Sequence, residues 1–265
     1  MKEKNEELFC SMPIPKAILV LAVPTVISQI ITIIYNMADT FFIGQLGEPR
    51  QVAAATLNMP LFMFMTALSN LFGVGGSSLI SRFLGANEHK KASHCCAFCI
   101  WTTTVSAFLY GIFMLLFRPV LMPVLGANEE TLPLASSYLF WTIGIGAVPT
   151  VLNPALAHLI RAEGYSKQAS FGVAFGGVLN ILLDPLFIYG LRLQITGAAI
   201  ATLISNTIAL LYFLQFIWKI RATSVLTLSP RMYRITDHIP SEVLSIGLPS
   251  FLISMMGTVS NTVLN

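Results

Sequence analysis

The stretch QASFGVAFGGVLNILLDPLFIYG, residues 168–190, is apolar for long enough to cross a lipid bilayer as a helix. It nevertheless contains a carboxylate, Asp184, within the motif NILLDP at 180–185. A charged side chain at the middle of a membrane costs at least about 2.5–3.5 kcal/mol, so such residues face a bundle interior or a water-filled cavity. The stretch therefore predicts a membrane-spanning helix that carries a functional acid.

The composition of the whole chain agrees with a membrane protein. Of its 265 residues, 55% are hydrophobic and only 10% are charged, with a mean hydropathy of +0.76. Soluble domains carry about a quarter charged residues, and a chain of this length could not hide so much apolar surface in one core. The net charge of +3 gives no case for nucleic-acid binding. We therefore expect the lipid bilayer to be the main partner.

Seven long apolar runs follow one another along the chain. The candidate spans are residues 16–44, 53–80, 92–117, 132–158, 168–190, 197–219 and 241–265. Backbone polar groups in lipid must be satisfied within each segment, which leaves the helix as the form of every span. The sequence predicts an all-α integral membrane protein, a six-helix transmembrane bundle followed by a seventh span that is cut short.

Lysine and arginine predict the orientation of these spans. Most of them fall on one side: Lys2, Lys4, Lys16, Arg82, Lys90, Lys91, Arg161, Lys167, Lys219, Arg221, Arg231 and Arg234. The connections on the other side hold Arg50, Arg118 and Arg192. By the positive-inside rule the N-terminus is cytoplasmic. The polar segment 1–15 lacks the features of a signal peptide, so we expect it to be a cytoplasmic tail.

An internal repeat predicts how the spans are grouped. At a constant offset, Ile14-Pro15 aligns with Ile239-Pro240, Pro24 with Pro249, and Asn36 with Asn261. Repeated halves of about six helices are a common plan of transporters. We expect an N-terminal lobe at 16–220, a cytoplasmic linker at 221–240 and the first helix of a second lobe at 241–265. The rest of the C-terminal lobe would then be missing from this chain.

Two acids remain inside the spans, and each lies near an amide. Asn180 and Asp184 are four residues apart and Asn36 and Asp39 three apart, so each pair shares a helical face. Carboxylate and amide oxygens are ligands for a hard cation, and a buried acid can also hold and release a proton. The alternatives are that Asp39 is half solvated at the outer end of its span and that Asp184 caps a kink before Pro185.

Pro24 lies in the middle of the first span, where a proline removes a backbone hydrogen bond and kinks a helix. A bend there would move Asn36 and Asp39 relative to the fifth span. A static kink is the alternative, and the sequence does not choose between the two.

No catalytic arrangement competes with a transport function, so we do not expect an enzyme. His89, His94, His158 and His238 are scattered, and GVGGSS at 73–78 lacks the Gly-Lys-Ser/Thr ending of a phosphate loop. The cluster of Cys95, Cys96 and Cys99 lies in an apolar run, where thiols behave as small hydrophobes. We expect no metal besides Na+ at the acid site and no cofactor besides the coupling ion.

Five motifs together resemble the MATE multidrug and toxin extrusion family, and most closely its bacterial cation-coupled antiporters. They are NMADTFFIGQLGE at 36–48, SRFLGA at 81–86, IRAEG at 160–164, NILLDPLFIYG at 180–190 and GAAIATLIS at 197–205. The resemblance implies a twelve-helix, two-lobe transporter of a bacterial cytoplasmic membrane. Such proteins export cationic amphipathic drugs in exchange for Na+ or H+, and the sequence does not choose between these ions.

The same resemblance implies site residues. The cation site of the N-terminal lobe falls on Asp39, Asn180, Asp184 and Thr202, although Thr202 alone would be interpreted as a packing hydroxyl. Tyr35, Asn36 and Asn153 are candidates for lining the drug cleft, and ordinary packing is the alternative for Tyr35.

Two other functions stay open. One is a flippase of lipid-linked precursors from the same superfamily, and the other is a membrane fragment that transports nothing.

Overall fold

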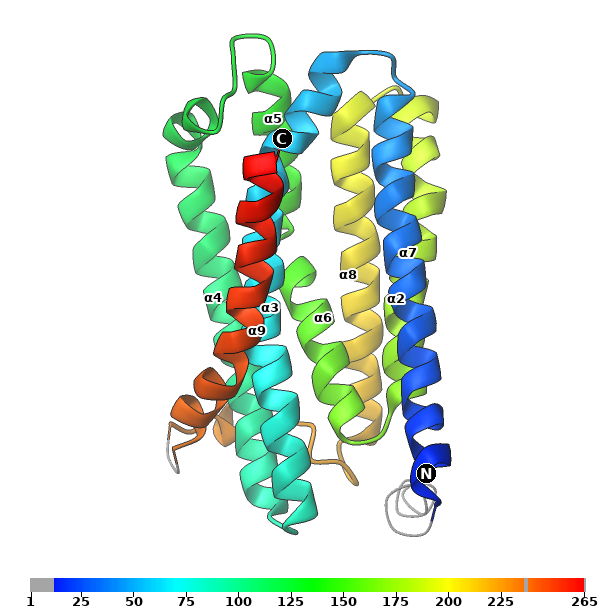
Figure 1. The fold of residues 1–265 in the computed structure, drawn as a ribbon, viewed down its shortest axis with the longest axis vertical. Helices are drawn as coiled ribbons and strands as arrows, with labels where there is room; N and C mark the ends of the chain where they lie inside the picture. Colours follow the sequence, from blue (N-terminus) through cyan, green and yellow to red (C-terminus); the bar gives the residue numbers. More distant parts are fainter. Residues whose placement is uncertain (1–11, 236–237, 265) are drawn as a thin grey trace.

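The fold is all-helical, as the sequence predicts. A computed structural model describes residues 12–235 and 238–264, without the side chains of Ala17 and of residues 257–264. Its α-helices are α2 (Ile14–Gly44), α3 (Pro49–Gly85), α4 (His89–Val124), α5 (Leu132–Leu139), α6 (Ala147–Ala162), α7 (Ser166–Pro185), α8 (Gln194–Ile220) and α9 (Ile239–Leu264). Three short turns join them: η1 (Phe140–Ile145), η2 (Leu186–Gly190) and η3 (Pro230–Met232). The long helices run side by side along the length of the molecule (Figure 1).

Six of the helical segments are long and apolar enough to cross a membrane, and the pair α5 and α6 adds a seventh if it counts as one span. This pair, predicted as one helix over 132–158, is bent by 52°. Pro149 cannot donate a backbone hydrogen bond to Ile145, and the chain turns through the π-helical η1 at that point. At Gly146 a Cβ would lie 2.4 Å from the Thr142 carbonyl oxygen, so the bend needs a glycine there.

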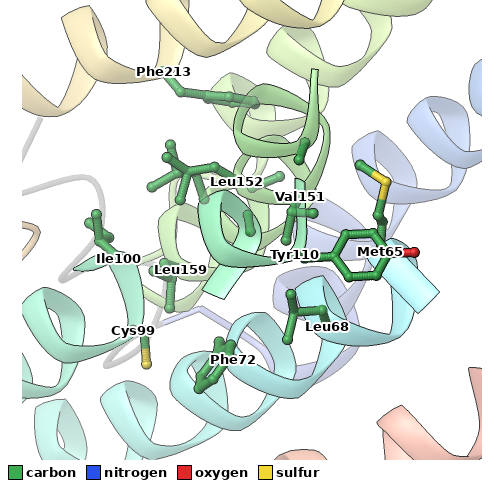
Figure 2. Packing of buried hydrophobic residues seen from close by; sticks show 14 of the residues in the cluster. Met65, Leu68, Phe72, Cys99, Ile100, Tyr110, Val151, Leu152, Leu159 and Phe213 are labelled. Atoms are coloured by element: carbon green, nitrogen blue, oxygen red, sulfur yellow. The ribbon is translucent and has the colours of Figure 1, made fainter. Parts of the chain in front are cut away.

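The interior is packed by α3, α4 and α6, with α8 behind them. Figure 2 shows Leu68 and Phe72 of α3, Leu159 of α6 and Cys99 of α4 among the buried side chains of this core. Cys95, Cys96 and Cys99 are free and fully buried, as expected of small hydrophobes, whereas Cys10 lies outside the described residues. Large apolar side chains on the outer faces are exposed, which suits helices that face lipid acyl chains.

Helix α9 packs closely along α3. A Cβ on Gly247 would lie 1.9 Å from the Leu71 carbonyl oxygen, and one on Gly75 would lie 2.2 Å from the Val243 carbonyl oxygen. Glycines on both helices therefore let the backbones touch, as small residues do between membrane helices. Helices α2 and α9 also begin at the matched residues Ile14 and Ile239. The side chain of the other repeat residue, Asn261, lies outside the described residues.

The N-terminal end of α2, the α6–α7 turn and the α8–α9 linker lie at the same end of the molecule (Figure 1). The sequence predicts that this end is cytoplasmic, and the orientation stays a prediction. The predicted cytoplasmic tail at 1–15 consists mostly of residues 1–11, which lie outside the described residues. Arg161, assigned by the sequence to the loop between the fourth and fifth spans, lies in the last turn of α6.

Candidate cation site

The candidate site centres on Asn180 and Asp184, one turn apart on α7. Their side chains are almost fully buried, with 3% and 0% of their surface exposed. The Asn180 amide Nδ2 donates to Asp184 Oδ1 at 3.3 Å and to Thr202 Oγ1 of α8 at 3.4 Å. Three of the four predicted cation-site residues are thus joined by hydrogen bonds, and the predicted sharing of a face by Asn180 and Asp184 is confirmed.

Asp39 approaches this group from α2, which packs against α7. It is half-buried, and it lies near enough to Asp184 for the two carboxylates to repel each other electrostatically. In residues 12–235 and 238–264 the ion pairs are Arg50–Glu48 and Lys91–Glu88, both on the surface, so neither acid has a basic partner there. Two carboxyl groups are therefore held close together without a compensating cation from the protein.

The hydrogen bonds leave several oxygens of the site unsatisfied. Asp39 Oδ1, Asn180 Oδ1 and Asp184 Oδ2 are buried and have no hydrogen-bond partner in the described residues. A buried carboxylate without a partner is costly unless it binds a cation or takes up a proton. Oxygens of this kind suit a hard cation such as Na+, and a proton shared by the two acids would relieve the same repulsion. The donor set fits the coupling ion expected from the sequence.

Tyr138 of α5 is a residue of this site that sequence reasoning missed. It is 5% exposed, and its hydroxyl interacts electrostatically with both Asp39 and Asp184. Its ring meets the ring of Phe62 edge-on, with centroids 6.1 Å apart. The segment SSYLFW around it is an ordinary apolar run. No sequence signal marked Tyr138, because only the packing of α5 inside the bundle brings it to the acids.

The three drug-cleft candidates are not brought together. Tyr35 is half-buried, and its ring packs against Gly177 of α7. A Cβ on Gly177 would lie 2.9 Å from this ring. Asn36 is exposed and lines an open hollow of about 500 Å³ on α2. Asn153 is 6% exposed and donates to the Asn206 carbonyl of α8 at 2.8 Å. Each stays a prediction, and Asn153 lies within the bundle rather than on an open face.

Pro24 lies inside an uninterrupted α2. The following turns are lined by hydroxyls that donate back to the helix: Thr25 to the Leu21 carbonyl at 3.0 Å, Ser28 to that of Thr25 at 2.8 Å, and Thr32 to that of Ser28 at 2.9 Å. Such bonds slightly destabilise and often bend helices, and Pro24 leaves one carbonyl without its donor. The segment is therefore suited to bending.

The fold and site define a polytopic α-helical membrane protein with a buried acidic group between its helices. The family model MatE matches residues 24–186, most of the described bundle. The chain belongs to the MatE family.

Individual relatives agree with this assignment. The chain is 32% identical to the multidrug export protein MepA of Staphylococcus saprophyticus over 265 residues, which is all of this chain and 58% of that protein. A crystal structure of MATE in complex with MaD3S superposes with a TM-score of 0.90 at 30% identity, over 99% of this chain and 58% of that one. The relatives are transporters by name rather than enzymes, and the chain spans a little over half of their length.

Two further structures show MATE in different states. MATE in the straight conformation has a TM-score of 0.85 at 31% identity, over 94% of this chain and 55% of that one. MATE in the bent conformation has a TM-score of 0.83 at 31% identity, with the same shares covered. Similar proteins therefore adopt two conformations, one of them bent.

Proposed function

We propose that this chain forms the ion-binding part of a secondary active transporter that exports cationic amphipathic drugs in exchange for Na+ or H+. The observation that carries the proposal is the pair of repelling carboxyls of Asp39 and Asp184, each with one unsatisfied oxygen, beside Asn180 and Thr202. The names of its relatives, a multidrug export protein and MATE, support the same function.

The exchange follows from competition between conformations. An ion that binds one conformation better than another shifts the population toward it, and a drug that prefers the other conformation shifts it back. Neutralising the acids by an ion lets α2 and α7 approach, and losing the ion restores their repulsion. Asp39 on α2 and Asp184 on α7 would thus make the position of α2 depend on the ion.

The remaining assignments belong to this proposal. Residues 16–220 form the N-terminal lobe, 221–240 the inter-lobe linker and 241–265 the first helix of the second lobe. The N-terminus is cytoplasmic, in a bacterial inner membrane. Single cysteines at Arg50 and Lys90 test the orientation in intact cells, because only the first should react with an impermeant maleimide. The opposite pattern would overturn it.

The decisive experiment measures ion-coupled export of a cationic dye by the full-length protein in everted vesicles. Asp184→Asn keeps the size of the side chain but cannot bind a cation by charge, so we expect export to be lost. Glu129→Gln is the matched control, because it neutralises an exposed loop acid. Normal dye export and ion counter-flow in Asp184→Asn would refute the proposal. Varying Na+ at fixed pH then separates Na+ from H+ coupling.

A further inference from the structure

The turn between α6 and α7, residues 161–164, makes contacts that the cation site does not explain. We call it the α6–α7 corner. Gly164 adopts a φ of +90°, which favours glycine, and its amide donates to the Arg161 carbonyl at 2.9 Å. The Tyr165 amide donates to the Ile160 carbonyl at 3.3 Å, and both of these residues are buried. The corner is therefore a compact turn anchored in the core.

On one side the corner holds α2. Arg161 Nη2 donates to Ser28 Oγ at 3.3 Å, and Ser28 is 1% exposed. Ser28 lies one turn after Pro24 and donates to the Thr25 carbonyl, so Arg161 contacts the segment of α2 suited to bending. Arg161 Nε is buried with no hydrogen-bond partner in the described residues. Buried polar groups are normally hydrogen-bonded, so a guanidinium with an unsatisfied nitrogen suits a contact that changes between conformations.

The far end of α2 is attached separately, by the Tyr189 hydroxyl of η2, which donates to the Phe42 carbonyl at 2.6 Å. The Arg161 contact therefore bears on the half of α2 near Pro24, while Asp39 lies toward the other end. A bend of α2 at Pro24 would move the segment that Arg161 holds.

On its other side the corner holds the α8–α9 linker. The Glu163 carboxylate accepts hydrogen bonds from the Ser224 hydroxyl and from the Val225 amide at 3.1 Å, and the Leu226 amide in turn donates to the Ser224 hydroxyl oxygen at 3.0 Å. Val225 and Leu226 are 6% and 0% exposed, so this part of the linker is packed into the lobe.

The next part of the linker continues along α4. The Met232 carbonyl lies 2.9 Å from Nδ1 of His94, and Tyr233 stacks on Phe98 with ring centroids 5.9 Å apart. Residues 224–233 are thus attached to the lobe at two places before α9 begins at Ile239. A shift of the α6–α7 corner would displace the first part of the α8–α9 linker.

We propose that the α6–α7 corner couples α2 to the linker, with Arg161 and Glu163 as positioning residues. When α2 bends at Pro24, Ser28 moves away from Arg161, the corner relaxes, and the linker segment held by Glu163 changes its position. The inference rests on the proposed function, in which the ion acts on α2. It names the route by which a bend of α2 reaches the α8–α9 linker.

Hydrogen–deuterium exchange on the full chain in nanodiscs, without added drug, tests the coupling in both directions. Glu163→Ala should speed exchange of the Val225 and Leu226 amides by about tenfold or more, because it removes the charged acceptor of the Val225 amide and of the Ser224 hydroxyl, to which the Leu226 amide donates. If the corner couples the two elements, the same variant also speeds exchange in α2 after Pro24. Conversely, Ser28→Ala and Arg161→Met should speed exchange at Val225 and Leu226, whose amides are hydrogen-bonded to Glu163 and to Ser224 instead.

Arg82→Met is the matched control, because Arg82 is exposed in the last turn of α3. It should change neither segment. Glu163→Gln keeps an acceptor oxygen and guards against a variant that fails to fold, and we expect an intermediate effect in both segments. The coupling is refuted if Glu163→Ala and Glu163→Gln affect only the linker while Ser28→Ala and Arg161→Met affect only α2.

A transport measurement separates this inference from the proposed function. Ser28→Ala and Arg161→Met should lower the maximal rate of dye export and leave the half-saturating dye concentration unchanged, because they impair movement and not binding. Equal rates to the unmodified protein would overturn the coupling. Export that persists in Asp184→Asn refutes the proposed function instead, whatever the exchange data show.

Discussion

Glu163 and Asp184 are acidic side chains of the same helical bundle, and their surroundings differ. Glu163 is half-buried at the end of α6 and accepts hydrogen bonds from two consecutive linker residues, Ser224 and Val225. Asp184 is fully buried in α7, receives one hydrogen bond from Asn180 and keeps a second oxygen unsatisfied. An acid whose oxygens are matched by backbone donors holds the chain in place, whereas an acid left unmatched in the bundle is suited to binding an ion or a proton.

The largest effect should come from removing the unmatched acid. We expect Asp184→Asn to lower ion-coupled export about 100-fold or more, because losing one charge from a buried site costs on the order of 3 kcal/mol. The thermal midpoint of the purified protein should not fall, since the substitution removes an uncompensated charge. Dye export and differential scanning fluorimetry check the two halves of this prediction. A large loss of stability with normal export in Asp184→Asn would mean that Asp184, and not only Glu163, serves to hold the fold together.

The matched acid should show the opposite pattern. We expect Glu163→Ala to lower the free energy of unfolding by about 1–3 kcal/mol, since the Ser224 hydroxyl and the Val225 amide lose their acceptor. Denaturant titration in detergent measures this change. Glu88→Gln is the control: its carboxylate pairs with Lys91 at the surface at 2.9 Å, where ion pairs contribute little. A Glu163→Ala protein as stable as this control would show that the linker is held by packing alone.

A smaller effect should follow from the hydroxyl that completes the cation site. We expect Thr202→Val to weaken ion binding about fivefold, because it removes one neutral hydrogen bond to Asn180 and one potential oxygen ligand. Ser205→Ala on the same helix is the control, since its hydroxyl donates to the Thr202 carbonyl of its own helix at 3.1 Å. Isothermal titration with NaCl, or with acid if Na+ does not bind, measures the affinity. Equal affinities would leave Thr202 as the packing hydroxyl of the alternative interpretation.

The difference between the two acids also shows which features the sequence predicts. The cost of a charge in lipid is a local property, so apolar runs and the two acids within them identified the spans and the pairing of Asn180 with Asp184. The helix ends agree with the predicted spans to within a few residues, apart from the longer α3 and α4. Local sequence was sufficient for these features because each depends on one helix.

Features that depend on several helices could not be predicted in this way. The 52° bend between α5 and α6 arises from a proline and tightly packed glycines in three dimensions, and it accompanies the approach of Tyr138 to the acids. The direction of the Glu163 side chain depends on where the linker returns after α8. In the sequence Glu163 is a loop acid like Glu88, and only the fold distinguishes the acid that binds the linker from the one at the surface.

The smallest expected effect is a dependence of folding stability on pH through Glu163. Burial raises the pKa of the Glu163 carboxyl above its ordinary 4.5, against the opposing effects of the linker hydrogen bonds and of His89. The nearby Cys96 thiol and Tyr165 hydroxyl also interact with its charge. A raised pKa means that Glu163 binds a proton more tightly in the folded protein than in the unfolded chain. This contribution to stability is fully present below pH 4.5 and is lost as the pH rises through the raised pKa.

The free energy of unfolding, measured by denaturant titration in detergent, should therefore decrease slightly as the pH rises from below 4.5 toward neutrality. Glu163→Gln should remove this part of the pH dependence, because an amide does not titrate. His89→Gln separates the charge of that histidine from the titration of Glu163, and it should leave the direction of the effect unchanged. A Glu163-dependent stability that increases with pH would mean that the hydrogen bonds from the linker outweigh burial, so that the folded protein stabilises the ionised carboxylate more than the protonated one.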